Sequence, residues 1–97
     1  MGAGVKEDGK RRLFLVGAAD EPDALVRVLN VVTVLQARLR RIEAEPTDGG
    51  LAIRLEIDDA GDHKAEALAR RLEACPVVTG LAFGWKHGLA SVARAPT

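Results

Sequence analysis

Few side chains in this sequence have the type and spacing that catalysis needs. Cys75 could act as a nucleophile, but a thiol needs a neighbouring base or cation for activation, and neither a histidine nor an asparagine is recognisably placed to supply one. Its position directly before Pro76, where a helix should end, favours a packed core cysteine. The sequence has no glycine-rich phosphate loop after a strand and no serine elbow. We therefore predict a protein that is not an enzyme.

The acidic stretch 58–62, followed by His63, is the cluster that most resembles a metal site. It offers the carboxylates of Asp58, Asp59 and Asp62. The stretch lacks the longer ligand spacing and the closing glutamate of a calcium loop, and one histidine without a second is a poor zinc ligand set. We interpret it as a loop that begins a helix, with Asp62 as the N-cap, and predict neither a metal nor a cofactor.

Composition and charge exclude several classes of partner. The 97 residues include 14 Lys+Arg and 14 Asp+Glu, so the formal net charge is zero, whereas nucleic-acid and membrane-surface binders usually carry a basic excess. The basic clusters at 10–12 and 38–41 have no interleaved aromatic residues, and His87 is isolated. No apolar run approaches the ~18 residues of a membrane span. With one cysteine, which fits a reducing compartment, we expect a cytoplasmic protein that binds neither nucleic acid nor membrane.

Hydrophobic periodicity predicts the element order strand, helix, strand, strand, helix, strand. Apolar runs or alternations predict strands over 13–16, 37–45, 51–57 and 77–83. The stretch 25–32 is rich in valine, which favours strand by propensity, but its acidic start and its apolar spacing of i, i+3, i+4, i+7 favour a helix. A second helical stripe comprises Ala65, Leu68, Ala69 and Leu72.

This order predicts an α+β fold, a ferredoxin-like βαββαβ sandwich with a four-stranded antiparallel sheet and two helices on one face. The alternation slips by one residue between Leu39 and Ile42, which predicts a β-bulge near Arg40 and Arg41. We divide the chain into a flexible leader (1–11), the domain (12–85) and a loose tail (86–97). The predicted inward-facing strand residues are Phe14, Val16, Leu39, Ile42, Ile53, Leu55, Ile57, Val78, Leu81 and Phe83.

The sheet face without helices is the predicted contact surface. It should carry Leu13, Leu15 and Ala82, together with the polar residues Arg38, Arg54 and Glu56. Adjacent exposed leucines favour contact with another protein, although single surface leucines are common and need no explanation. Trp85 could anchor a partner or fold over the sheet edge. The open edge strands favour a homodimer with a continuous sheet.

The element order, with a polar turn and a proline before a leucine-rich first helix, resembles the ACT domain, a ligand-sensing module attached to many enzymes of amino-acid metabolism. The run EPDALVRVLNVV at 21–32 is similar to the small subunit of acetolactate synthase, isozyme II type, as is its spacing to 51–57 and to Leu68 and Leu72. The resemblance covers about 13–83. It implies a regulatory subunit without catalytic residues, which binds the large thiamine-diphosphate-dependent subunit of acetolactate synthase, an enzyme of branched-chain amino-acid synthesis.

The resemblance also implies where an amino-acid effector would bind. Many ACT domains hold it at the turn before the first helix, with a typical pattern of Asn, a variable residue, Pro and Gly. Here Asp20 replaces the Asn and Asp23 replaces the Gly, so Asp20, Glu21, Asp23 and Ala24 form a degenerate effector loop. The Asp23 carboxylate would take the position of the effector's own carboxylate at the helix start, or the acids would simply cap the helix.

On either interpretation we expect no valine sensing at this loop. Two other functions stay open. A free-standing ACT-type sensor would bind an amino acid at a dimer interface. A small enzyme on the same sandwich, such as an acyl-phosphate hydrolase, would need a phosphate-cradling loop that the acidic stretch 19–22 does not offer.

Overall fold

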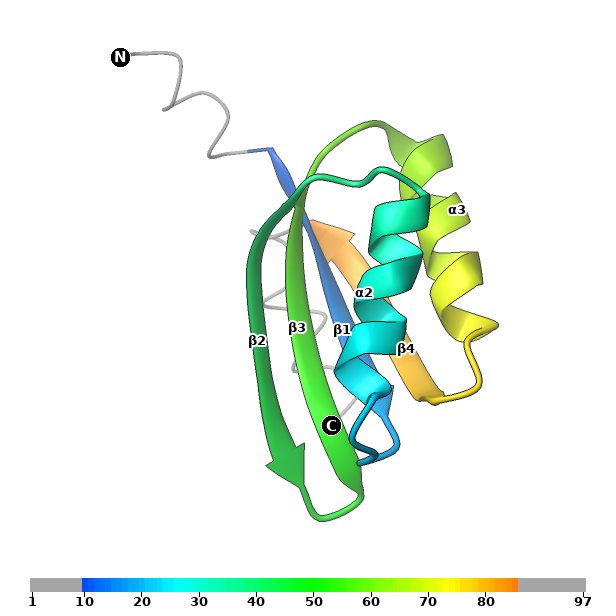
Figure 1. The fold of residues 1–97 in the computed structure, drawn as a ribbon. Coiled ribbons are helices and arrows are strands. Elements are labelled where there is room, and N and C mark those ends of the chain that lie inside the picture. Colours follow the sequence, from blue (N-terminus) through cyan, green and yellow to red (C-terminus); the bar gives the residue numbers. More distant parts are fainter. Residues whose placement is uncertain (1–9, 86–97) are drawn as a thin grey trace.

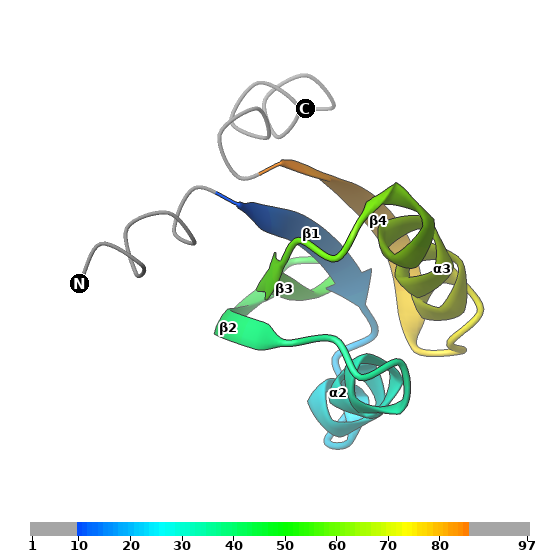
Figure 2. The same ribbon diagram turned by 90° about the horizontal axis from the view of Figure 1, so that it is seen from above.

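Alternating apolar residues build a four-stranded sheet, and two amphipathic helices cover one of its faces (Figures 1 and 2). The computed structural model describes residues 10–85. The strands are β1 (Arg11–Ala18), β2 (Leu39–Thr47), β3 (Gly50–Asp58) and β4 (Val78–Trp85), and the helices are α2 (Ala24–Val34) and α3 (Asp62–Glu73). The strand order is β2-β3-β1-β4 with every neighbouring pair antiparallel, which confirms the predicted fold.

The core lies between the helices and the inner face of the sheet, as predicted. The buried strand residues include Phe14, Ile53 and Leu55, each at most 2% exposed. Phe83 is the exception in the predicted set, because it is 36% exposed, yet its ring stacks on Phe14 with centroids 5.4 Å apart. Four predicted residues are only partly buried but pack against the core: Leu39, Ile42, Val78 and Leu81.

Helix α2 buries Val28 and Val32 of the predicted stripe and adds Ala24. The buried residues are Ala24, Val28 and Val32, which lie four apart and so share one face. The predicted stripe included Leu25 and Leu29, which are only half-buried because they flank that face. In α3, by contrast, the predicted stripe of Ala65, Leu68, Ala69 and Leu72 is the buried face.

The ends of the elements refine the sequence boundaries. The register of β2 against β3 shifts between Leu39 and Arg41, which confirms the predicted bulge. Strand β1 begins at Arg11, one residue before the predicted domain start. Helix α3 has Gly61 as its N-cap, so the prediction for Asp62 is wrong: it is the first helical residue and makes no side-chain cap bond. Leader residues 1–9 and the predicted tail, with His87, lie outside the described residues.

Pro46 and Gly50 show how the β2–β3 hairpin is built. Pro46 lies inside β2, where it is tolerated because β2 is an edge strand. Gly50 has φ 151°, and a Cβ at this position would clash with the carbonyl oxygen of Ala18. The hairpin therefore needs glycine at this residue. Neither described helix is long and apolar enough to cross a membrane.

Candidate functional site

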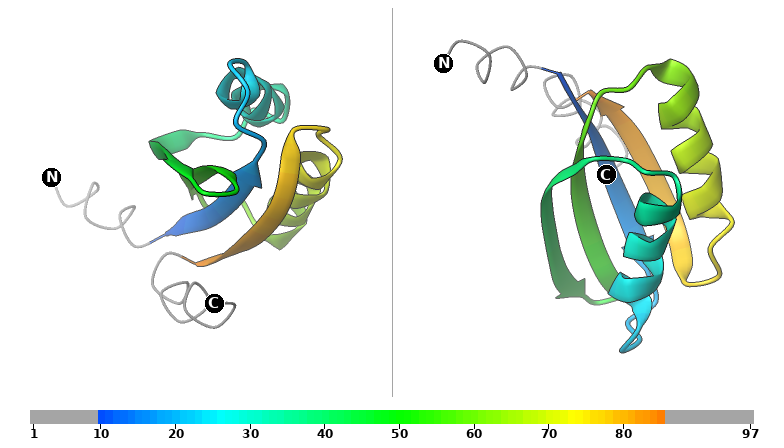
Figure 3. Two further views of the ribbon diagram at one scale, coloured as in Figure 1. Left: turned by 90° about the horizontal axis from the view of Figure 1, so that it is seen from below. Right: turned by 45° about the horizontal axis from the view of Figure 1, so that its top comes forward.

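The sandwich presents its loops at two ends, and each end carries a candidate site. At one end lie the loop that starts α2 and the β2–β3 hairpin (Figures 1 and 3). At the other end lie the loop between α2 and β2 and the loop between β3 and α3. The sequence-predicted effector loop is at the first end, and a cavity described below is at the second.

The predicted effector loop is exposed and acidic, but its carboxylates do not cap α2. Asp20, Glu21 and Asp23 are exposed, whereas Ala24 is fully buried against the core. Asp23 is the N-cap residue and makes no side-chain cap hydrogen bond. Its Oδ2 instead accepts a hydrogen bond of 2.8 Å from Nε of Arg27, one turn further along the helix. The expectation that the Asp23 carboxylate occupies the anion position is therefore wrong.

The residues predicted to contact a partner do not form one exposed patch. Leu13, Leu15 and Ala82 lie on the sheet face opposite the helices, as expected from their register. Leu13, however, is only 2% exposed and Leu15 and Ala82 are half-buried, so the predicted pair of exposed leucines is absent. Trp85 pairs with Arg12 and lies on the helix-covered face, so the structure separates it from the other three.

Arg12 is the central polar residue at the second end of the sandwich. Its Nε donates to Oδ1 of Asp59 at 2.9 Å and its Nη2 to Oδ1 of Asp62 at 2.7 Å, while the guanidinium lies 3.7 Å from the centroid of the Trp85 ring. The Arg12 side chain is 8% exposed. Its carboxylate partners raise the pKa of Arg12 even though burial opposes this. Arg12 thus connects β1 to the end of β4 and to the start of α3.

The acidic stretch 58–62 is held by arginines. The Gly61 backbone N–H, followed by the Arg12 side chain, lowers the pKa of Asp59. A hydrogen bond of 2.7 Å from Nη2 of Arg40 lowers the pKa of Asp58. In residues 10–85, no group of three histidine, cysteine or acidic side chains is placed to hold a metal ion. Cys75 is half-buried and packs against the core.

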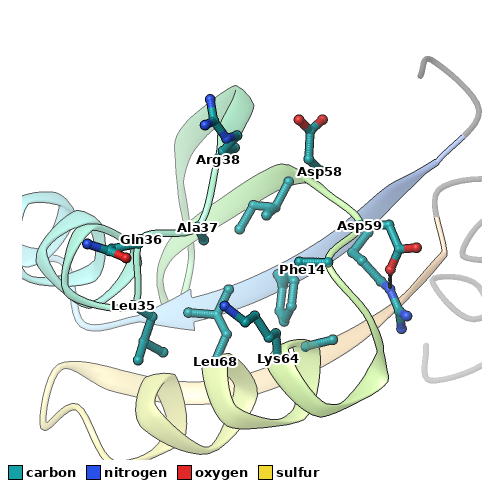
Figure 4. Close-up of a pocket in the computed structure, with 13 residues that line it drawn as sticks. Phe14, Leu35, Gln36, Ala37, Arg38, Asp58, Asp59, Lys64 and Leu68 are labelled. Atoms are coloured by element: carbon teal, nitrogen blue, oxygen red, sulfur yellow. Dashed lines mark hydrogen bonds and ion pairs between the residues drawn. The ribbon is translucent and has the colours of Figure 1, made fainter.

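A cavity of about 400 Å³ lies beside the Arg12–Asp59 ion pair, between the C-terminal end of α2 and the N-terminal half of α3 (Figure 4). Its inner wall is apolar and is formed by Phe14, Leu35, Ile57, Ala65 and Leu68. Its remaining lining comes mainly from the two loops and from the first turn of α3: Arg12, Gln36, Ala37, Arg38, Asp58, Asp59, Ala60 and Lys64.

The backbone at the end of α2 shapes the rim of the cavity. Gln36 has φ 58°, the left-handed conformation that often ends a helix, and its N–H donates to the carbonyl of Thr33 at 2.9 Å. The N–H of Ala37 donates to the carbonyl of Val32 at 3.1 Å, which ties the turn to the helix. This sharp turn takes the chain from α2 into β2 and places Ala37 and Arg38 at the rim.

Lys64 and Arg38 supply positive charge at the cavity. Both side chains are exposed, and neither forms an ion pair with another residue of 10–85. Figure 4 shows the Lys64 side chain reaching toward Leu68 on the same helix, while Arg38 and Asp58 lie on the side away from α3. The cavity therefore combines an apolar wall with Lys64, which has no ion-pair partner in residues 10–85, and with Arg38, which helps to lower the pKa of Asp58.

Sequence reasoning did not find this cavity. It placed Arg38 on the open sheet face, whereas Arg38 lies in the loop before β2, and it assigned no role to Lys64. The two residues are far apart in the sequence, and neither lies in a motif. The predicted topology could have shown that these residues meet, because in this element order the first helix ends at the same end of the sheet at which the second helix begins.

Comparison with known proteins supports the fold. No protein-family model and no curated protein sequence matches this chain. Among solved structures, the crystal structure of the ACT domain from GTP pyrophosphokinase of Chlorobium tepidum matches with a TM-score of 0.68 and 16% identity, over 77% of this chain and 97% of that domain.

Two further structures are similar. The C-terminal domain of the MgtC protein from Mycobacterium tuberculosis has a TM-score of 0.64 at 15% identity, over 78% of this chain and 86% of that domain. A formyltetrahydrofolate deformylase from Pseudomonas putida has a TM-score of 0.54 at 16% identity, over 77% of this chain but 28% of the deformylase chain. This chain therefore has the ferredoxin-like fold of ACT domains.

Proposed function

We propose that this chain is a regulatory domain of the ACT type, without catalytic residues, which acts by binding a partner enzyme. The observation that carries the proposal is the fold, since one ACT domain is matched over 97% of its length. The sequence of 21–32 resembles the small subunit of acetolactate synthase, isozyme II type. The proposed partner is therefore the large, thiamine-diphosphate-dependent subunit of that enzyme, in the cytoplasm.

The edge strands are the proposed route to a partner or to a second copy. In the described sheet β2 and β4 are the edge strands, and an edge strand offers unpaired backbone groups to another chain. β4 also carries Phe83 and Trp85, which are 36% and 41% exposed, whereas β2 contains Pro46, which disfavours pairing along its length. We therefore propose β4 as the edge along which a homodimer forms a continuous sheet.

Charge at the start of α2 supports a domain that does not sense valine there. An amino-acid effector would bring its carboxylate close to Asp20, Glu21 and Asp23, which are all exposed. The nearby cation, Arg27, is already hydrogen-bonded to Asp23. A loop with a net negative charge repels the carboxylate of an amino acid. This repulsion does not depend on whether Asp23 caps the helix.

Co-expression with a candidate large subunit tests the proposed function. We expect acetolactate formation to rise when both chains are present, and a complex to co-elute on gel filtration. Phe83→Gln should weaken the homodimer, whereas Val26→Gln, which replaces another exposed apolar residue on the outer face of α2, should not. Circular dichroism checks that both variants fold. Unchanged activity and separate elution of the two chains would contradict the proposal.

A free-standing amino-acid sensor is the second candidate, and one observation favours it. Because the Asp23 carboxylate turns to Arg27, no side chain caps the start of α2. A calorimetric titration with valine, with no partner present, separates the two candidates. We expect no binding, whereas micromolar binding of valine would favour the sensor.

A further inference from the structure

We propose that the cavity between α2 and α3 binds a small monocarboxylate with an apolar body. This site is distinct from the effector loop. Arg12, which lines the cavity, lies near the start of β1, whereas the loop at 20–23 follows Ala18 at its end, so the two sites are at opposite ends of the sheet (Figures 1 and 4). The inference rests on the cavity itself and holds whether or not the chain is an accessory subunit.

The apolar wall determines the body of the ligand. Phe14, Ile57 and Leu68 form the floor of the cavity and are at most 4% exposed, whereas the half-buried Leu35 and Ala37 offer more apolar surface to a ligand. Leu35 and Ala65 continue this wall from the two helices. A volume of about 400 Å³ is near the lower end of the range for small-molecule pockets. The wall therefore suits a short aliphatic chain better than a large ring system.

The charges determine the head group. Three cations (Arg12, Arg38, Lys64) and two carboxylates (Asp58, Asp59) line the cavity, which leaves one excess positive charge. Arg12 is hydrogen-bonded to Asp59, and Arg38, after the hydrogen bond from Arg40, helps to lower the pKa of Asp58, so the one excess charge lies on Lys64. One net positive charge matches a single carboxylate. The two aspartates would repel a polyanion such as a nucleoside triphosphate.

Lys64 places the positive charge of the cavity next to its apolar wall. Its side chain reaches toward Leu68, one turn further along α3, so a cation and an apolar residue lie side by side in the lining (Figure 4). A ligand whose carboxylate binds beside Lys64 would place its aliphatic chain against Leu35 and over the apolar floor of the cavity. Charge-assisted hydrogen bonds are stronger than neutral ones, particularly where the surroundings exclude water.

The walls of the cavity are fixed before any ligand arrives. Arg12 holds the loop before α3 through Asp59 and α3 itself through Asp62, and the left-handed turn at Gln36 fixes the opposite rim. A ligand that enters such a site loses less free energy to ordering of the protein than one that must assemble its site.

An NMR titration of the full chain with hexanoate tests the proposal, with hexanamide as the uncharged control. We expect hexanoate to shift the amide signals of Gln36, Arg38, Ala60 and Lys64, and to leave the loop at 20–23 unchanged. Hexanamide, which lacks the charge, should bind about tenfold more weakly.

Variants identify the residues responsible. Lys64→Gln should weaken hexanoate binding about tenfold, whereas Arg71→Gln, which removes an exposed cation from the same helix outside the cavity, should not change it. Ala65→Leu should abolish binding by filling the cavity, and its circular dichroism spectrum shows whether the fold is kept. The proposal is overturned if hexanoate shows no binding below about 10 mM, if hexanamide binds equally well, or if Lys64→Gln binds like the unmodified chain.

Discussion

Arg12 offers the sharpest test of how this domain is held together at the cavity end. The change Arg12→Met removes the guanidinium but keeps an unbranched, apolar side chain that replaces the aliphatic part of arginine. It breaks the hydrogen bonds to Asp59 and Asp62 and the contact with the Trp85 ring. Asp59 then keeps the Gly61 N–H as its hydrogen-bond partner but loses its nearest cation.

The three contacts of Arg12 contribute different amounts to the free energy of unfolding, because their partners differ in solvent exposure. Asp59 is 23% exposed, so its charged hydrogen bond contributes ~1.5 kcal/mol. Asp62 is 83% exposed, and its ion pair adds at most a few tenths of a kcal/mol. The cation–π contact with the half-exposed Trp85 adds ~0.5 kcal/mol. Since methionine avoids the cost of burying a charge, we expect a net loss of about 2 kcal/mol.

Urea and thermal unfolding, followed by circular dichroism at pH 7, measure this loss. For a domain of this size, 2 kcal/mol corresponds to a fall in Tm of about 10 °C. The control is Arg27→Met, which removes the ion pair with Asp23, where both side chains are about half exposed. We expect a small change in Tm for the control. If Arg12→Met destabilises the domain no more than Arg27→Met does, the structural role given to Arg12 is wrong.

Three further substitutions test single features of the backbone and of the acidic loop. Gly50→Ala should cost more than ~3 kcal/mol in urea unfolding because its Cβ clashes with Ala18, whereas Gly49→Ala, with open space around it, should cost little. Gln36→Gly should raise the unfolding free energy by up to ~1 kcal/mol, because glycine adopts φ 58° without strain. A fall in the unfolding free energy would contradict this prediction. The lowered pKa of Asp59 stabilises the fold above about pH 4, and this contribution is lost as the pH falls through the folded-state pKa. Asp59→Asn should therefore be less stable at pH 7 and should lose less stability between pH 7 and pH 3; equal slopes of unfolding free energy against pH would refute this.

The fold could be predicted from the sequence because its signals are repeated along the chain. The alternation of Ile53, Leu55 and Ile57 fixed one buried strand, and the slip between Leu39 and Ile42 located the bulge. For α2 the acidic start and the apolar spacing outweighed the β propensity of its valines. Helix α2 forms because its apolar face packs on the sheet, which local propensity does not measure.

The polar contacts could not be predicted, because they depend on directions that sequence spacing does not give. Asp23 and Asp62 are both residues typical of an N-cap, yet each carboxylate turns to an arginine instead. Arg12 is one of a run of basic residues in the sequence. Only the register of β1 against β3 and β4 brings it to Asp59 and Trp85.

The two ends of the sandwich differ in charge, and this difference connects the two proposals. At the start of α2, Asp20, Glu21 and Asp23 outnumber the nearby Arg27, so that end disfavours a carboxylate ligand. At the C-terminal end of α2, Lys64 lies beside an apolar wall and the nearby aspartates pair with arginines, so that end favours a carboxylate ligand.

Because both helices line this second site, a ligand there would stabilise α2 and α3 against each other, and through α3 the neighbouring strand β4. If β4 is the edge used for assembly, hexanoate should strengthen the homodimer, and Lys64→Gln should remove this effect while leaving the dimer that forms without ligand unchanged. Sedimentation at matched protein concentrations, with and without hexanoate, measures this coupling, and an unchanged dimer constant would show that the cavity and the edge strand act independently.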